Sequence, residues 1–387
     1  TTLDVAFSRA MNGATLDFTD LQLTRDGADV PLNGGLGVVA VDASHFRLTG
    51  LDGFTSQPGS YVLTVRAAGT QDANGVAGTG AFSRSWTLDT AAPSPVAIEE
   101  ITTDPRNIVV MSLDVTTSEA VDAASFDWHD LTLTKDASTA NLITSEVTVT
   151  RLDATHWRVE AFNWKVGLDG RYTLTVNGAG LRDLAGNAGT GSVSRSWTMD
   201  KSAPLAPTQL QLSPDTGADT ADGLTRSRTL TVTGALPEDG LRVRLTDLAT
   251  GTELGLATVD GRSFSHSFTL GSPGAHHIRL RVADAAGNLA PDSFVDVFVD
   301  EVAPGVSSVA APTPNPRTTA VDTLDLAFDE AIDAGTVDRS DITLTRDGVD
   351  VPLDAGVTLT ALGAQQWRIG GLAAFTAAPG VYQLTVD

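Results

Sequence analysis

The stretch LTRDGADVPL at residues 23–32 returns almost unchanged as LTRDGVDVPL at residues 344–353. In the same frame, TLDVAF at residues 2–7 matches TLDLAF at residues 323–328. The match continues without a gap to the YVLTV stretch of the first copy and the YQLTV stretch of the second. Such self-similarity over long distances is the signature of a chain built from repeated structural units.

A third, diverged copy lies between these two. His156-Trp-Arg-Val corresponds to His45-Phe-Arg-Leu, and Tyr172-Thr-Leu-Thr-Val corresponds to Tyr61-Val-Leu-Thr-Val. Residues 204–302 follow a different internal pattern. They nevertheless end in the same junction motif, an aspartate followed by three residues and a proline. Links this short, with a proline, join domains with little slack.

We therefore predict four domains of ordinary size, at residues 1–92, 93–203, 204–303 and 304–387. The first lacks a counterpart of residues 96–107, and the last lacks a counterpart of residues 180–200. Both end domains are predicted to be incomplete. Either the sequence cuts through them, or a strand from another chain completes them.

Apolar residues alternate with polar ones over short runs throughout the chain. In Tyr172-Thr-Leu-Thr-Val the odd members are apolar, and in Ile278-Arg-Leu-Arg-Val arginines take the polar positions. A period of two predicts half-buried strands, and about seven such runs separated by turn residues predict an immunoglobulin-like sandwich. The predicted fold class is all-β, as tandem immunoglobulin-like sandwiches in an elongated string.

Aromatic side chains recur at matching repeat positions and are predicted to anchor the cores. This set comprises Phe46, Trp86, Trp157, Trp197 and Trp367. Trp128 and Trp164 lack aromatic counterparts in every repeat, so the pattern leaves their exposure open.

The amino-acid composition disfavours several classes of binding partner and several kinds of chemistry. The formal net charge of −23 disfavours nucleic acid and anionic membrane surfaces, and it favours cations. The sequence has no cysteine, which excludes disulfides and thiolate chemistry. No apolar run approaches the roughly 20 residues that span a bilayer, so membrane insertion is not expected. No signal peptide opens the sequence, which we expect to begin inside a longer protein.

A family resemblance rests on several of these stretches. SPDTGADTADGLTRSRTLTVTG from Ser213 and VADAAGNLAPDS from Val282 resemble the bacterial Ig-like repeats of giant adhesins exported by type I secretion, of the kind associated with repeats-in-toxin sequences. TSEAVDAASFDWHDLTLT from Thr117 and LRDLAGN from Leu181 look like related repeats of large surface and biofilm proteins. The resemblance covers essentially the whole chain and implies an extracellular or cell-surface location.

Acidic loops form three sets of candidate cation ligands. In such a sandwich, Asp200 should approach the loop of Asp284 and Asn288, and Asp89 should approach the loop of Asp183 and Asn187. The loop between the first two strands of the third domain should lie near the junction that follows it, bringing Asp215, Asp219 and Asp222 towards Asp300.

Oxygen-rich loops of this kind suit calcium, which takes six to eight oxygen ligands. The resemblance also implies calcium at domain junctions, since members of the family carry it there. The alternative is that the D-x-A-G-N loops are only turns, in which Asp and Asn bond their own backbone. The first repeat departs from this motif, because Val76 replaces the final asparagine.

The sequence offers no convincing catalytic site, and we expect no enzyme activity. Its six histidines are scattered: His45 and His156 occupy equivalent repeat positions, and His276 and His277 begin a strand. A glycosidase would need a unique pair of carboxylates, whereas these aspartates recur once per repeat. No phosphate-binding loop is present.

The leading prediction is a structural extender of a giant bacterial adhesin, stiffened by calcium and contacting chiefly its own neighbouring repeats. Host or matrix glycans or proteins would bind domains outside this stretch. The alternatives are a glycan- or protein-binding module that uses exposed aromatics such as Trp128 or Trp164, a subunit of a surface lattice or sheath, and an accessory region of a secreted enzyme.

Overall fold

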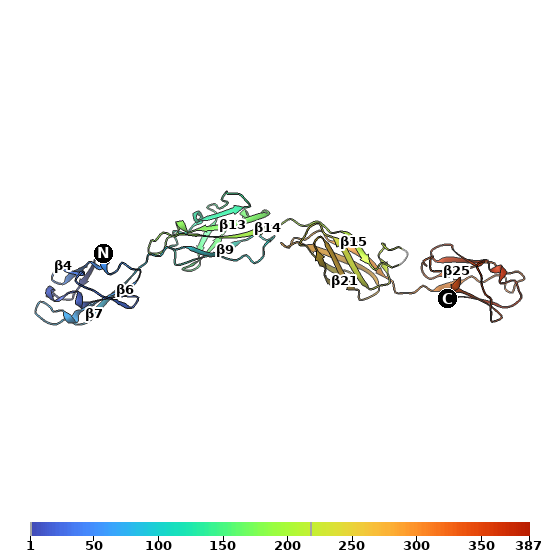
Figure 1. The fold of residues 1–387 in the computed structure, drawn as a ribbon, viewed down its shortest axis with the longest axis horizontal. Helices are drawn as coiled ribbons and strands as arrows, with labels where there is room; N and C mark the ends of the chain where they lie inside the picture. The colour runs from blue at the N-terminus through green and yellow to red at the C-terminus, as the bar shows by residue number, and fades with distance from the viewer. Residues whose placement is uncertain (1, 217–218) are drawn as a thin grey trace. The chain divides into compact units, whose positions relative to one another are not determined.

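The computed structural model describes residues 2–216 and 219–387. Its regular structure consists of β-strands and three-residue 3-10 helices, with no α-helix among those residues. The chain divides into two compact units, the first ending at Lys201 and the second beginning at Ser202. Each unit contains two pairs of sheets, which we call the first to fourth sandwich in chain order (Figure 1).

The first unit contains two sandwiches of seven strands each. In the first sandwich, sheet β3-β2-β6-β7 faces sheet β1-β5-β4, and in the second, sheet β11-β12-β9-β8 faces sheet β10-β13-β14. The strands of the first are β1 Leu3–Ala6, β2 Leu21–Arg25, β3 Ala28–Val30, β4 Gly37–Ala40, β5 His45–Thr49, β6 Gly59–Arg66 and β7 Ala81–Leu88. Those of the second are β8 Pro95–Ile98, β9 Ser112–Thr117, β10 Leu131–Lys135, β11 Thr148–Arg151, β12 His156–Glu160, β13 Gly170–Asn177 and β14 Ser192–Met199.

The second unit contains the third and fourth sandwiches. The third has sheets β15-β17-β21-β20 and β16-β23-β22-β18-β19, and the fourth has sheets β24-β25-β29-β28 and β27-β26-β30. The strands of the third are β15 Thr208–Ser213, β16 Leu224–Thr225, β17 Thr229–Ala235, β18 Arg242–Asp247, β19 Thr252–Leu256, β20 Thr258–Asp260, β21 Ser263–Thr269, β22 Gly274–Ala283 and β23 Ser293–Val299. Those of the fourth are β24 Val306–Val309, β25 Leu324–Phe328, β26 Ile342–Arg346, β27 Val349–Asp350, β28 Thr358–Ala361, β29 Gln366–Gly370 and β30 Tyr382–Val386.

Short 3-10 helices connect the strands and reuse the recurring aspartates. In η5 (Trp128–Asp130), the carboxylate of Asp127 accepts from the backbone N–H of His129, and that of Asp130 accepts from the N–H of Asp127. Reciprocal caps of this kind satisfy backbone donors at the start of a helix. The same cap begins η2 and η8, so these aspartates have a structural role. The 3-10 helices are η1 Gly13–Thr15, η2 Phe18–Asp20, η3 Leu51–Gly53, η4 Ala67–Gly69, η5, η6 Asn163–Lys165, η7 Gly178–Gly180, η8 Arg339–Asp341 and η9 Leu372–Ala374.

Each sandwich has its own hydrophobic core. Phe46, Trp157, Trp197 and Trp367 are buried, which confirms four of the five predicted anchors. Trp86 is only half-buried, because β14 lies against β8 whereas β7 pairs only with β6 among the described strands. Of the two residues without counterparts, Trp128 packs half-buried against the core, while Trp164 is 53% exposed.

A tyrosine ties a strand to its preceding loop in three of the sandwiches. The hydroxyl of Tyr172 donates to the carbonyl oxygen of Leu168 at 3.0 Å, four residues earlier. Tyr61 and Tyr382 make the same bond to the residue four positions before them. This arrangement is the tyrosine corner of immunoglobulin-like domains, and it pins the loop to the sheet edge.

Candidate metal centre

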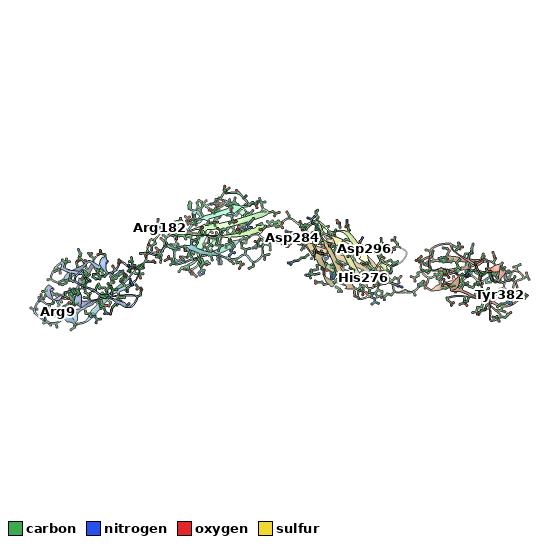
Figure 2. The ribbon with its side chains drawn as sticks, viewed as in Figure 1. Arg9, Arg182, His276, Asp284, Asp296 and Tyr382 are labelled. Atoms are coloured by element: carbon green, nitrogen blue, oxygen red, sulfur yellow. The ribbon has the colours of Figure 1, made fainter. Side chains whose placement is uncertain are left out.

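The Asp183 loop is a tight hairpin between β13 and β14. The backbone N–H of Asn187 donates to Oδ1 of Asp183 at 2.8 Å, and its side-chain amide donates to Oδ2 at 2.6 Å. Gly186 takes a φ of 92°, in the left-handed region that glycine adopts without strain. The carboxylate of Asp183 is therefore held in one orientation by its own loop. Figure 2 labels Arg182, which directly precedes it.

The loops at Asp284 and Asp72 have closely similar backbone geometry. Asn288 bonds both oxygens of Asp284 in the same way, at 2.8 Å each. In the first sandwich the N–H of Val76 donates to Oδ1 of Asp72 at 2.9 Å, so the turn forms without the asparagine. The local hydrogen bonds predicted for a turn are thus present in all three loops. The side-chain amide adds contacts that the turn itself does not require.

The side chain of Asn187 also reaches the preceding sandwich. Its Nδ2 lies 3.1 Å from the carbonyl oxygen of Asp89, the residue directly after β7. The carboxylate of Asp89 accepts from the N–H of Ala91 at 2.9 Å. The expected approach of Asp89 to the Asp183 loop is therefore seen within the first unit.

A third carboxylate, Glu119, completes this cluster. One carboxylate oxygen from each of Asp89, Glu119 and Asp183 lies within 4.8 Å of the others. Glu119 follows β9, where the hydroxyl of Thr117 donates to its carbonyl oxygen at 2.8 Å. Asp183 is buried and the other two are half-buried, so water screens the three negative charges only in part.

Two members of the cluster have pKa values that are shifted in opposite directions. Burial raises the pKa of Glu119, and the charges of Asp89 and Asp183 raise it further. Burial also raises the pKa of Asp183, but hydrogen bonds from Asn187, Gly186 and Ala185 outweigh it, so the net pKa lies below its usual value. The net shift favours the ionised form of Asp183, whereas the nearby negative charges favour the protonated form of Glu119.

The donors present fit a hard divalent cation. All three members of the cluster offer carboxylate oxygens, the ligand type that Ca²⁺ prefers among its six to eight oxygen ligands. No sulfur or imidazole belongs to the cluster, which disfavours a zinc-type site. Within the two described ranges, this is the only grouping of three acidic or histidine ligands that the structure brings together.

The other predicted ligands bond mainly to nearby backbone. In the third sandwich, Asp215 accepts from the N–H of Gly223 at 3.0 Å, Asp219 from that of Ala221, and Asp222 from that of Leu224. Asp300 accepts from the N–H of Val302 at 3.0 Å. Asp200 belongs to the first unit and Asp284 to the second, so their predicted meeting stays a prediction.

The sequence pattern did not predict Glu119 as a ligand, because the predicted ligands all lie in turns or at domain junctions. A signal did exist in the repeats: Glu330 takes the position of Glu119 in the fourth copy, while Arg9 takes it in the first. The first copy therefore differs from the second at two positions of the cluster, Arg9 and Val76.

Comparisons with known proteins give one family match, for part of the chain, and distant similarities to solved structures. Residues 202–301 match the family model of a bacterial Ig-like domain. No curated protein matches the sequence. Similar solved structures include two titin fragments, both 12% identical. One covers 77% of this chain and 92% of its own with a TM-score of 0.25, and the other covers 72% and 88% with a TM-score of 0.35.

A third similar structure is the N-terminal part of the bacterial S-layer protein SbsC. It is 14% identical, covers 54% of this chain and 44% of its own, and has a TM-score of 0.21. In the described part of the chain, no helix has the length and apolar character needed to cross a membrane.

Proposed function

We propose that this chain is a spacer in a large bacterial surface or secreted adhesin, and that calcium stiffens its domain junctions. It holds a binding domain away from the cell and performs no catalysis itself. The observation that carries the proposal is the cluster of Asp89, Glu119 and Asp183, which joins the end of one sandwich to two loops of the next.

Several features support a mechanical role. The sandwiches are repeated, each has its own core, and residues 202–301 match a bacterial Ig-like domain. In such arrays the stability is close to a sum of unit terms and neighbour terms. A stronger junction therefore increases the free energy of interaction between neighbouring sandwiches, without any change in their cores.

Calcium would act at the junction through charge. Asp89 follows the last strand of the first sandwich, whereas Glu119 and Asp183 belong to the second. Without a cation, three crowded carboxylates repel one another and favour separation of the two sandwiches. With a cation, the same three groups become ligands of one ion, and bending the junction would break its coordination.

A substitution of Glu119 tests this proposal by calorimetry. Glu119→Gln removes one charge at nearly constant size, so in chelator the variant should melt above the unchanged chain because repulsion is relieved. In millimolar calcium the order should reverse, because the variant has lost a ligand. A ligand at a hundredfold excess over its Kd stabilises the folded state by about 2.7 kcal/mol.

The matched control is Glu146→Gln, which removes a charge from an exposed loop outside the cluster. It should leave the calcium response unchanged. Equal calcium responses in all three proteins would remove the cluster as a cation site and leave the loops as turns. Small-angle scattering of the unchanged chain, with and without calcium, then measures whether the ion stiffens the particle.

A second candidate function is glycan binding, which the exposure of Trp164 favours. The residue as a whole is 53% exposed, as expected of a tryptophan that stacks on a sugar. However, the Nζ of Lys165 lies 3.6 Å from the centre of the ring and already covers one face. A glycan array probed with the chain and with Trp164→Ala would support this function if binding were found and then lost in the variant.

A further inference from the structure

The third sandwich buries an ion-pairing histidine in its core. His276, near the start of β22, is 4% exposed, and Asp247, at the end of β18, is 2% exposed. The Nδ1 of His276 lies 2.8 Å from Oδ2 of Asp247. The other ring nitrogen, Nε2, lies 3.0 Å from the carbonyl oxygen of Ser272. Figure 2 labels His276 in this sandwich.

This histidine occupies the place of the corner tyrosine in the other three sandwiches. Tyr172 comes two residues after Gly170 at the start of β13, and His276 comes two residues after Gly274 at the start of β22. Both side chains reach a carbonyl oxygen four residues earlier. The imidazole therefore replaces the phenol as the group that pins the loop.

The residue that contacts the histidine also differs from its counterparts in the other sandwiches. Asp247 lies opposite Ile278, two residues after the histidine, just as Leu133 lies opposite Leu174, two residues after the tyrosine. The counterparts of Asp247 in the other sandwiches are buried leucines, Leu23, Leu133 and Leu344. A tyrosine and leucine have thus been replaced together by a histidine and aspartate, although an apolar pair fills the same place elsewhere in this chain.

The hydrogen bonds assign the protons of this pair. Asp247 accepts from the hydroxyl of Thr250 at 2.7 Å and from the N–H of Ala249 at 3.0 Å, in addition to His276. Burial raises the pKa of Asp247, but these hydrogen bonds outweigh it, and the net pKa lies below its usual value. Asp247 is therefore a carboxylate, and a carbonyl oxygen never donates. Both nitrogens of His276 face acceptors only, so both must carry hydrogen.

We propose that the third sandwich is a pH-responsive element, locked while His276 is an imidazolium and loosened as rising pH removes its proton. A neutral imidazole has one hydrogen, which leaves either the Asp247 carboxylate or the Ser272 carbonyl buried against a lone pair. A buried acceptor without a donor destabilises the fold. The inference is independent of calcium and concerns a different sandwich from the candidate metal centre.

Other titratable groups face this region from the neighbouring elements. His277, Asp222 and Asp296 line a shallow hollow beside His276, and the Nδ1 of His277 lies 2.6 Å from Oδ1 of Asp296. The side chains of His277 and Asp296 are 46% and 83% exposed, so water screens their pair. Arg228 donates to the carbonyl oxygen of Gly271 and pairs with Glu301, so its charge is already neutralised.

Nuclear magnetic resonance of the ring nitrogens tests the protonation state in the full chain. At about pH 7.5, where an ordinary histidine is neutral, one of the six histidines should show both nitrogens protonated. That signal should disappear in His276→Tyr/Asp247→Leu, the pair found in the sibling sandwiches. Six neutral imidazoles at this pH would overturn the proposal.

Amide hydrogen exchange tests the consequence for stability, with peptides from β18 and β22 followed from about pH 6 to about pH 9. After correction for intrinsic exchange, protection in the unchanged chain should fall by up to about tenfold per pH unit, since one proton is linked to opening. The sign follows because the proton is bound by the folded state, so stability is complete at the lower pH and lost as pH rises.

Three variants make the outcome decisive. His276→Tyr/Asp247→Leu should keep constant protection over this range. If that protein fails to fold, Asp247→Asn serves instead, because its amide donates to a neutral His276 and satisfies the network at every pH tested. His277→Thr, which copies Thr173 of the second sandwich, should retain the full pH dependence. Unchanged protection in the parent chain, or loss of the effect in His277→Thr, would overturn the proposal.

Discussion

At the scale of single residues, the buried hydroxyl of the corner tyrosine has one partner and no alternative in water. Tyr172 is fully buried, stacks on Trp197 with ring centres 5.8 Å apart, and donates to Leu168. Its aromatic ring supplies core area, while its hydroxyl decides where the preceding loop lies. The two contributions can be separated, because phenylalanine keeps the first and removes only the second.

Tyr172→Phe should therefore destabilise the second sandwich by about 1–2 kcal/mol, because the hydrogen bond from the buried hydroxyl to the carbonyl oxygen of Leu168 is lost. Urea unfolding followed by tryptophan fluorescence measures the loss, since Trp197 reports on the same core. Tyr382→Phe is the matched control: Tyr382 makes the same bond but is only half-buried, so water replaces the donor there. Equal losses at both positions would contradict this explanation.

At the scale of elements, the 3-10 helices are packed on one another through an aspartate and a glycine. In the second sandwich η7 lies on η5, and a Cβ built on Gly180 would sit 1.8 Å from Oδ1 of Asp130. In the first sandwich a Cβ on Gly69 would sit 1.9 Å from Oδ1 of Asp20. Neither glycine has a positive φ. Glycine is therefore required at both positions by the close approach of the aspartate and not by the backbone conformation.

Gly180→Ala should cost about 1–3 kcal/mol, because the added methyl group must displace the capped Asp130 carboxylate from its position. Gly167→Ala is the control, since a Cβ there meets no atom within 4 Å and the backbone φ is not positive. Thermal unfolding of both variants measures the difference. A Gly180→Ala protein as stable as the Gly167→Ala protein would show that η5 and η7 separate easily.

At the scale of the whole molecule, the separate cores imply separate unfolding transitions. Each sandwich buries its own apolar cluster, and short links connect them in sequence. The third sandwich is distinct spectroscopically as well, because residues 202–301 contain neither tryptophan nor tyrosine. Its unfolding is therefore invisible to tryptophan fluorescence but contributes heat.

Calorimetry should accordingly show at least one transition that tryptophan fluorescence does not follow. The reason is that unfolding is not two-state when several domains melt independently. Both signals are to be recorded on the same sample at the same heating rate. A single transition that coincides in both would mean that the sandwiches unfold as one cooperative unit, which would contradict independent cores.

The sequence alone was sufficient for the all-β class and the immunoglobulin-like sandwich. Alternation in Tyr172-Thr-Leu-Thr-Val specifies which side chains face the core, because the period of a strand equals two wherever it occurs. The repeat positions of Trp157 and Trp367 likewise predicted buried side chains. The predicted topology also indicated that Asp89 approaches the Asp183 loop. The last strand of one sandwich ends where the chain enters the next, and the loop before the last strand of that next sandwich lies at the same end.

Only the tertiary structure brought Glu119 to Asp183 and Asp247 to His276. Glu119 follows β9 and Asp183 follows β13, strands of opposite sheets, so their distance depends on how the two sheets stack. In sequence, His276 is simply a polar residue in a strand, and its role depends on the acceptors around it. Periodicity fixes the face on which a side chain lies, but the partner across the core is set by packing between segments distant in sequence.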